Sequence, residues 1–121
     1  MLINLSNHPS NQWSGKQFKA ATKKFKSVYD LPFPHISPKA NSKQVELKAN
    51  KYYDKILSLI KSSKDKSNAV HLMGEMTFVF QLTQVLKKKN IKVIASTTDR
   101  IVEEKNGKKI VTFNFVRFRE Y

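Results

Sequence analysis

Hydrophobic residues along the chain fall into two alternating patterns. Short apolar runs that end at polar residues, Gly or Pro predict strands, whereas segments with apolar residues at steps of three or four predict helices. The predicted strands are Met1–Ser6, Ser27–Leu31, Ala69–Met73 and Ile91–Ala95. The predicted helices are Gly15–Phe25, Lys43–Ser62 and Glu75–Lys89. Asn41 or Ser42 can cap the second helix, and the apolar face of the first contains Phe18, Ala21, Thr22 and Phe25.

The C-terminal segment changes to the pattern of a β-hairpin. Asn106-Gly107 separates two β-prone runs, and both central residues of a type I′ turn require positive φ. Pairing outward from this turn places Lys105 opposite Lys108, Glu104 opposite Lys109 and Val102 opposite Val111. Alternation puts Phe113, Phe115 and Arg117 on one face, which predicts a core-facing strand that emerges into solvent.

The order of the elements predicts an α/β fold. Strands and helices alternate through the first two-thirds of the chain, which implies parallel strands with right-handed crossovers, and the hairpin adds an antiparallel edge. The chain has 121 residues, 40% of them hydrophobic, so we expect one domain spanning residues 1–121. No segment approaches the roughly 18 apolar residues of a membrane span, and Met1–Ser10 lacks a signal-peptide pattern. We therefore expect a cytoplasmic protein with no membrane partner.

The charge balance points to an anionic partner. Lys and Arg number 23 against 9 Asp and Glu, which gives a formal net charge of +14. Such an excess fits nucleic acid, a nucleotide or an anionic membrane surface. The basic residues are spread along the chain, however, and only three are Arg, whose planar fork suits phosphate best. The dispersed lysines leave two interpretations open, a solubility role and a surface for binding duplex nucleic acid.

Side chains with binding chemistry cluster where the predicted strands end. The carboxyl ends of parallel strands meet at one edge of a sheet, where loop amides and helix N-termini gather ligands. The candidates are Ser6, Asn7 and His8 after the first strand, Gly74, Glu75, Met76 and Thr77 after the third, and Ser96, Thr97, Thr98 and Arg100 after the fourth. Small hydroxyl and amide side chains with one Gly and one Arg are typical of a cradle for phosphate or ribose.

Each of these residues also has a structural interpretation. Gly74-Glu75 can form a strand-to-helix turn with an acid at the helix N-terminus. Ser96–Thr98 can cap a turn, and His8 can be a surface residue. His71, which lies among apolar neighbours in a strand, is interpreted as a hydrogen-bonded core residue. Trp13 is interpreted as an anchor in the core or in an interface.

Several chemistries lack their sequence signals. The chain has no cysteine, which excludes disulfides and thiolate chemistry, and its three dispersed His residues lack carboxylates at a fitting spacing for a metal. GxGxxG, a P-loop lysine motif and a GxSxG elbow are missing, which disfavours dinucleotide enzymes, NTPases and α/β-hydrolases. We therefore expect neither a cofactor nor a metal.

Four segments carry a resemblance to a known group. LINLSNHPS, VHLMGEMTFVF, VIASTTDR and TFNFVRFREY resemble small stand-alone proteins encoded near type III CRISPR systems, the CRISPR-associated Rossmann-fold (CARF) and ring-nuclease group. The resemblance implies a Rossmann-like domain, a homodimer, and binding of a cyclic oligoadenylate messenger in antiviral signalling. Some members cleave the messenger without metal. This chain lacks the glycine-rich stretch with a lysine that follows the fourth strand of better-known members, so cleavage stays open.

The resemblance also implies roles for individual residues. Ser6–His8 and Ser96–Thr98 match the two places where that group contacts phosphate and ribose, with Gly74–Thr77 between them. Metal-free cleavage requires attack by the ribose 2′-hydroxyl, a proton acceptor and stabilisation of the developing charge. His8 is then the expected acid or base and Arg100 the expected electrostatic stabiliser. Hydrogen bonds to phosphate are expected from Ser6, Asn7, Thr97 and Thr98.

Two further classes of function stay open. A non-enzymatic RNA- or DNA-binding α/β protein would account for the net charge of +14, and its affinity would fall steeply with salt. A structural or regulatory protein would bury the hairpin edge or Trp13 against another chain. A messenger pocket instead predicts tight binding of one small ligand that survives moderate salt.

Overall fold

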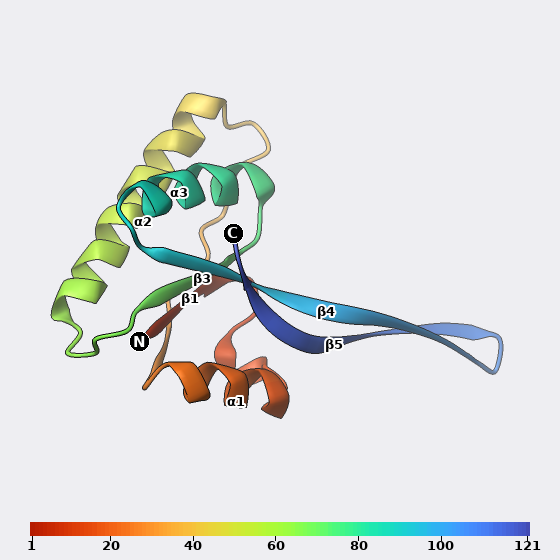
Figure 1. Cartoon of the computed structure of the whole chain (residues 1–121). Coiled ribbons are helices and arrows are strands. Elements are labelled where there is room, and N and C mark those ends of the chain that lie inside the picture. Colours follow the sequence, from red (N-terminus) through yellow and green to blue (C-terminus); the bar gives the residue numbers. More distant parts are fainter.

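Helices cover both faces of one central sheet (Figure 1). The computed structural model describes residues 1–121. The strands are β1 (Leu2–Ser6), β2 (Val28–Asp30), β3 (Ala69–Met73), β4 (Lys92–Lys105) and β5 (Lys108–Glu120). The helices are α1 (Gly15–Lys24), α2 (Ser42–Ser62) and α3 (Met76–Lys88), with a short 3-10 helix, η1, at Ser10–Gln12. The predicted α/β class, a mainly parallel sheet with a C-terminal antiparallel hairpin, is confirmed.

The strand order β2-β1-β3-β4-β5 places β1 and β3 side by side within the sheet. The pairs β1–β2, β1–β3 and β3–β4 are parallel, and the pair β4–β5 is antiparallel. From β1 the chain crosses outward to β2, and from β3 it crosses outward in the opposite direction to β4. The strand order therefore reverses between β1 and β3. Open α/β sheets bind their ligands beyond the carboxyl ends of the strands at such a reversal.

Each face of the sheet has its own hydrophobic core. Side chains of a strand alternate between the two faces, so Leu2 packs with residues of α1 whereas Ile3 and Leu5 pack with residues of α2 and α3. The α1 side is the smaller core, and Figure 1 shows α1 alone on that face. Trp13 is buried there, as predicted for a core anchor.

Side-chain caps define where the helices begin. The Asn41 side chain accepts the Gln44 N–H at 2.9 Å, and the Gln44 side chain accepts the Asn41 N–H at 2.8 Å. This reciprocal capping box makes Asn41 the cap of α2 rather than Ser42. Ser14 caps α1 and Glu75 caps α3. None of the three α-helices combines the length and the apolar character that crossing a membrane requires.

Helix α1 confirms only part of its predicted apolar face, because Ala21 and, just after the helix, Phe25 are buried whereas Phe18 and Thr22 are not. Gln17 and Ala21 are its buried residues, whereas Phe18 is 45% exposed and Thr22 is also exposed. A polar contact accounts for the burial of Gln17, whose Nε2 donates a hydrogen bond to Ser96 on β4 at 3.0 Å. Apolar periodicity alone missed this contact, since it counts Gln as a solvent-facing residue.

Strand β4 is longer than predicted. The sequence predicts a strand end at Ser96–Asp99, but β4 runs without interruption to Lys105. Its parallel pairing with β3 ends at Ile94, and antiparallel pairing with β5 carries it on to the turn. The hairpin register is confirmed on both sides of the turn, where Asn106 and Gly107 have φ of 53° and 74°. Residues 99–114 form a two-stranded arm that projects beyond the helices (Figure 1).

A β-bulge at the base of the arm changes which side chains share a face. Thr97 and Thr98 are consecutive, but their partners, Arg117 and Phe115, are not. Phe115 is 5% exposed on the α1 side, and Arg117, predicted to share its face, lies on the opposite face. Phe113 was also predicted to face the core, but it is 62% exposed because no helix covers the arm. Both expectations were wrong because strict alternation ignores the bulge and the length of the strand.

Candidate functional site

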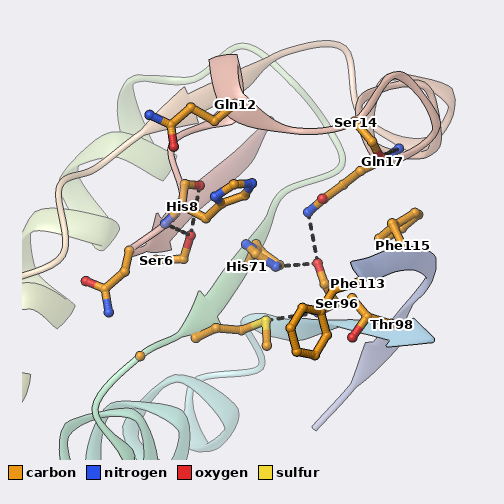
Figure 2. Close-up of a pocket in the computed structure, with 13 residues that line it drawn as sticks. Ser6, His8, Gln12, Ser14, Gln17, His71, Ser96, Thr98, Phe113 and Phe115 are labelled. Atoms are coloured by element: carbon orange, nitrogen blue, oxygen red, sulfur yellow. Dashed lines mark hydrogen bonds between the residues drawn. The ribbon is translucent and has the colours of Figure 1, made fainter. Parts of the chain in front are cut away.

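A cavity of about 660 Å³ opens at the carboxyl ends of β1 and β3, on the α1 side of the sheet (Figure 2). Its lining residues are Ser6, Asn7, His8, Gln12, Ser14, Gln17, His71, Met73, Gly74, Ser96, Thr98, Phe113 and Phe115. None of them is Lys, Arg, Asp or Glu, so hydroxyl, amide and imidazole groups supply the polarity. The volume is in the range of sites that hold small molecules, roughly 300 to 1,000 Å³.

The cavity gathers residues from all three predicted strand ends. The predicted residues that line it are Ser6, Asn7, His8, Gly74, Ser96 and Thr98. The lining residues that the sequence analysis did not propose for the site are Gln12, Ser14, Gln17, His71, Met73, Phe113 and Phe115. Met73 and Ser6 are register partners, and so occupy neighbouring places on β3 and β1. A site list drawn from every strand-end position on this face would have included Met73.

Five of the residues proposed from the sequence do not line the cavity: Glu75, Met76, Thr77, Thr97 and Arg100. Thr97 lies on the face of β4 opposite to Thr98, and its hydroxyl donates to the carbonyl of Arg117 at 3.1 Å. Arg100 lies two residues beyond Thr98 on the same face, opposite Phe113, and is exposed on the arm. Met76 is 82% exposed at the start of α3.

Packing explains the glycine that follows β3. A Cβ atom on Gly74 would clash with the ring of Phe33, which lies in the proline-rich loop before α2. Phe33 in turn meets Phe78 of α3 edge to face, with ring centroids 5.2 Å apart. The close approach that Gly74 permits is therefore to an aromatic ring of the chain itself.

Glu75 has the structural role that the sequence analysis considered for it, that of an acid at the N-terminus of α3. Its carboxylate accepts the backbone N–H of Thr77 at 3.1 Å and that of Phe78 at 2.8 Å. The hydroxyl of Thr77, followed by the backbone N–H of Phe78, holds the pKa of Glu75 below its ordinary value. Because this carboxylate already occupies the N-terminus of α3, that helix end does not offer its N–H groups to a phosphate.

A row of hydrogen-bonded polar side chains crosses the sheet below the cavity. Asn4 and His71 are register partners on β1 and β3 and are each 2% exposed, and Asp30 pairs with Asn4 on β2. Asn4 Nδ2 donates to Asp30 Oδ1 at 2.8 Å, and Asn4 Oδ1 lies 2.8 Å from His71 Nδ1. His71 Nε2 lies 2.7 Å from the hydroxyl of Ser96. These residues, Asp30, Asn4, His71 and Ser96, are called the polar row below.

His71 is the hydrogen-bonded core residue that the sequence predicts. Its imidazole meets Trp13 and Phe118 edge to face, with ring centroids 5.4 and 5.7 Å apart. Burial, and secondarily the charge of His8, lower the pKa of His71 to about 4. The ring is therefore neutral at pH 7, and it also borders the cavity, which the core interpretation did not include.

The loop that follows β1 is fastened to this row. The carbonyl of His8 accepts Asn4 Nδ2 and Trp13 Nε1, each at 3.0 Å. Asp30 accepts the backbone N–H of Ser10 at 3.1 Å and its hydroxyl at 2.7 Å. Burial raises the pKa of Asp30, but the hydrogen bonds from Ser10 and Asn4 outweigh it and leave the pKa below its ordinary value. With its backbone held in this way, the His8 side chain lies beside the cavity (Figure 2).

The cavity combines hydrogen-bond donors with an aromatic surface. Asn7, Gln12 and Thr98 line it without bonding to the other lining residues, so their donors are available to a ligand. Figure 2 shows Gln12 and Thr98 among the lining side chains. The ring of Phe113 stands at its edge, exposed on the arm. Such a lining can donate to phosphate or hydroxyl oxygens and stack against a planar base. No cluster of three His, Asp or Glu side chains lies close enough together to hold a metal ion.

Comparison with known proteins gives one match. A family model described as Uncharacterized protein MJ1673 family matches residues 1–119. No curated protein and no solved structure matches the chain. The matched residues include the sheet, except the last residue of β5, and all the residues that line the cavity.

Proposed function

The chain belongs to the Uncharacterized protein MJ1673 family, and we propose that it binds a cyclic oligoadenylate messenger in the cavity at the carboxyl ends of β1 and β3. The observation that carries the proposal is the convergence of Ser6, Gly74 and Ser96, from three strands, on one cavity at the reversal of strand order. Fold and position fit the CRISPR-associated Rossmann-fold group that the sequence resembles.

The cavity's donors fit the parts of such a ligand. Phosphate oxygens would accept from the side chains of Asn7, Gln12 and Thr98, and no carboxylate lines the cavity to repel them. An adenine ring would stack on the exposed ring of Phe113 and remove its apolar surface from water. Base stacking of this kind is worth about 1–3 kcal/mol. Neutral donors make the affinity depend less on salt than a lysine-lined groove would.

The net charge of +14 assists this ligand without defining the site. Long-range attraction raises the encounter rate of an anion with a positively charged protein, and salt weakens the effect. The same charge supports the second candidate, binding of RNA or DNA to the lysine-bearing surface. The two functions differ in their salt dependence, because a polymer neutralises many lysines and releases many counterions.

A second copy of the chain completes the proposed site. An isolated two-stranded ribbon is marginally stable in water, and the arm exposes Val102, Val111 and Phe113 on the face that continues from the cavity. On the same face of β4, Arg100 lies two residues before Val102 and Glu104 two residues after it. An antiparallel two-fold contact centred on Val102 would set Arg100 against Glu104 of the partner subunit. We assign Arg100 to this contact, since it does not line the cavity.

Calorimetric titration tests the proposal. The protein is titrated in EDTA with cyclic tetra-adenylate, cyclic hexa-adenylate, linear tetra-adenylate and poly(A), each at low and moderate salt. We expect one ring to bind tightly at both salt concentrations, and Thr98→Ala to weaken it while Thr22→Ala, an exposed Thr of α1, does not. Absence of binding to both rings overturns the proposal, and salt-sensitive binding of poly(A) alone selects the nucleic-acid function.

A further inference from the structure

The donors and acceptors in the polar row can be assigned in only one way. Asn4 Nδ2 donates to Asp30 Oδ1 and to the carbonyl of His8, at 2.8 and 3.0 Å. Both partners are acceptors, so the nitrogen of the Asn4 amide must face them and its oxygen must face His71. The Asn4 oxygen can only accept, and therefore His71 Nδ1, at 2.8 Å, carries the ring hydrogen.

The same assignment extends from His71 to Ser96 in the wall of the cavity. A neutral imidazole has one N–H, so His71 Nε2 bears a lone pair and accepts the hydroxyl hydrogen of Ser96 at 2.7 Å. Gln17 Nε2 donates to the same oxygen at 3.0 Å. Ser96 thus has its hydrogen directed at His71 and one lone pair bonded to Gln17, which leaves its second lone pair for the cavity that it lines.

This arrangement is that of a nucleophile with its base. In hydrolases with a serine nucleophile, an imidazole accepts the hydroxyl proton through one nitrogen, and a third side chain fixes the ring through the other. Here Ser96 has the place of the nucleophile, His71 that of the imidazole base, and Asn4 that of the side chain that fixes the ring. Asp30 holds the Asn4 amide in the required orientation. The ring of His71 borders the cavity, but its Nδ1 is engaged with Asn4 and its Nε2 with Ser96, so Ser96 is the group through which the imidazole acts on a ligand first.

We propose that Ser96 is a catalytic nucleophile for phosphodiester cleavage, with His71 as its proton acceptor and Asn4 and Asp30 as positioning residues. The choice of a phosphodiester rests on the proposed function. A serine that only bound phosphate would direct its hydrogen into the cavity, whereas here the hydrogen is directed at His71 and the remaining lone pair of the oxygen is left for the cavity. This role differs from the phosphate contact that the sequence resemblance implies for Ser96.

The reaction balances without a further reactant other than water. Ser96 Oγ attacks phosphorus, an Oγ–P bond forms and one P–O ester bond breaks. The Ser96 proton passes to His71 Nε2 and then to the departing oxygen, which leaves as an alcohol. Water then attacks phosphorus, the Oγ–P bond breaks, and Ser96 regains a proton through His71. The net result is hydrolysis of a phosphodiester to a phosphomonoester and an alcohol.

The base in this row is weak, and that sets the expected kinetics. Burial lowers the pKa of His71 to about 4, and the neutral amide of Asn4 stabilises an imidazolium less than a carboxylate would. The protein should therefore act slowly, and its rate should stay flat between about pH 6 and about pH 9, where His71 does not titrate. A free surface histidine as base would instead give a rate that falls below about pH 6.5.

A phosphorus electrophile tests Ser96 without any messenger. The full chain is incubated with an alkyl fluorophosphonate between about pH 6 and about pH 9, and the modified residue is located by peptide mass spectrometry. We expect one adduct, on Ser96, with loss of fluoride and a rate that does not change with pH. Ser96→Ala should abolish the adduct, and Ser62→Ala, at the exposed end of α2, should leave it unchanged.

His71→Gln tests the base. Gln preserves a polar group in the row but is no base, so labelling should slow about 100-fold, the lower end of general-base catalysis. Folding of the variant is checked by its far-ultraviolet circular dichroism. An adduct on another residue, no adduct, or equal rates for the folded His71→Gln protein and the wild type would overturn the proposal. If the variant does not fold, a wild-type rate that falls below about pH 6.5 would overturn it as well.

A ring without 2′-hydroxyls separates this inference from the proposed function. Attack by the ribose 2′-hydroxyl, the route implied by the sequence resemblance, gives a 2′,3′-cyclic phosphate and cannot act on cyclic tetra-deoxyadenylate. Attack by Ser96 opens the deoxy ring to a phosphomonoester. If the protein opens the cyclic oligoadenylate that contains ribose but not the deoxy ring, Ser96 is not the nucleophile, and the proposed messenger site is unaffected. Labelling of Ser96 without binding of either ring sustains the nucleophile and overturns the messenger.

Discussion

Asn4 and His71 are 67 positions apart in the sequence, and their side chains meet inside the sheet with Asn4 Oδ1 2.8 Å from His71 Nδ1. Both are almost completely buried, in a place where parallel strands usually carry aliphatic side chains. A buried polar group destabilises the fold unless it is hydrogen-bonded, and here each partner satisfies the other. The row that they form ends at Ser96 in the wall of the cavity.

Acid should weaken the fold through His71. Its pKa is about 4 in the folded protein against 6.5 for an ordinary His, so between these values the unfolded chain binds more protons. The free energy of unfolding should therefore fall as the pH is lowered from about 6.5 to about 4, by up to about 3 kcal/mol. Urea unfolding at a series of pH values measures this fall.

His71→Gln is the control for that acid effect. The variant lacks the titrating group, so its free energy of unfolding should change much less over the same pH interval. Asp30 has a pKa below 3.8 and weakens the fold only as the pH falls below that interval. An equally steep fall in His71→Gln would show that another group causes the acid sensitivity.

Gly74→Ala should destabilise the protein by about 1–3 kcal/mol through overpacking against Phe33. Gly15→Ala is the matched control, because nothing lies within 4 Å of the added Cβ at that place. It should leave stability unchanged or raise it by up to about 1 kcal/mol. Thermal unfolding of both variants, and of Gly74→Ala combined with Phe33→Leu, checks the cause. Equal effects of the two alanines would refute it.

Glu75→Ala should reduce stability and spare ligand binding. Loss of an N-cap costs about 1 kcal/mol, and the carboxylate of Glu75 satisfies the N–H groups of Thr77 and Phe78. The side chain does not line the cavity, so the affinity for cyclic oligoadenylate should not change. Urea unfolding and calorimetry on one preparation measure both properties. A large loss of affinity at unchanged stability would return Glu75 to the binding site.

Periodicity and turn chemistry were enough to predict most of the fold. Apolar spacing located the strands and helices, and Asn106-Gly107 fixed the hairpin register. The same reasoning ended β4 at Ser96–Asp99, because turn-forming residues stand there. In the structure, pairing with β5 overrides that local preference. The length of β4 depends on its pairing with another strand, and a local sequence pattern does not show such pairing.

The candidate site was predicted in outline only. Strand ends pointed to Ser6 and Ser96, because parallel strands finish at one edge. The role of Ser96 depends on Asn4 and His71, and strand register alone decides that these two side chains meet. Gln17 was missed for a related reason, since its helix turns a polar residue inward to reach Ser96. Buried polar contacts of this kind lie outside hydrophobic pattern analysis.

The arm should mediate the proposed dimer through one face. Val102 and Ile101 are 41% and 39% exposed and lie on opposite faces of β4, which makes them a matched pair. Val102→Lys should convert the dimer to monomer, because it places like charges across the two-fold contact, and Ile101→Lys should not. Light scattering gives the mass of each. A monomeric wild type, or equal disruption by both lysines, would contradict the arrangement.

The state of the His71 ring, with and without ligand, tests the central claim most directly. Nitrogen-15 NMR of the imidazole distinguishes protonated from unprotonated ring nitrogens. The account predicts a neutral ring at pH 7 with hydrogen on Nδ1 and a lone pair on Nε2, and a shift of the Nε2 resonance when cyclic oligoadenylate binds beside Ser96. Hydrogen on Nε2, or a resonance that does not move at saturating ligand, would contradict it.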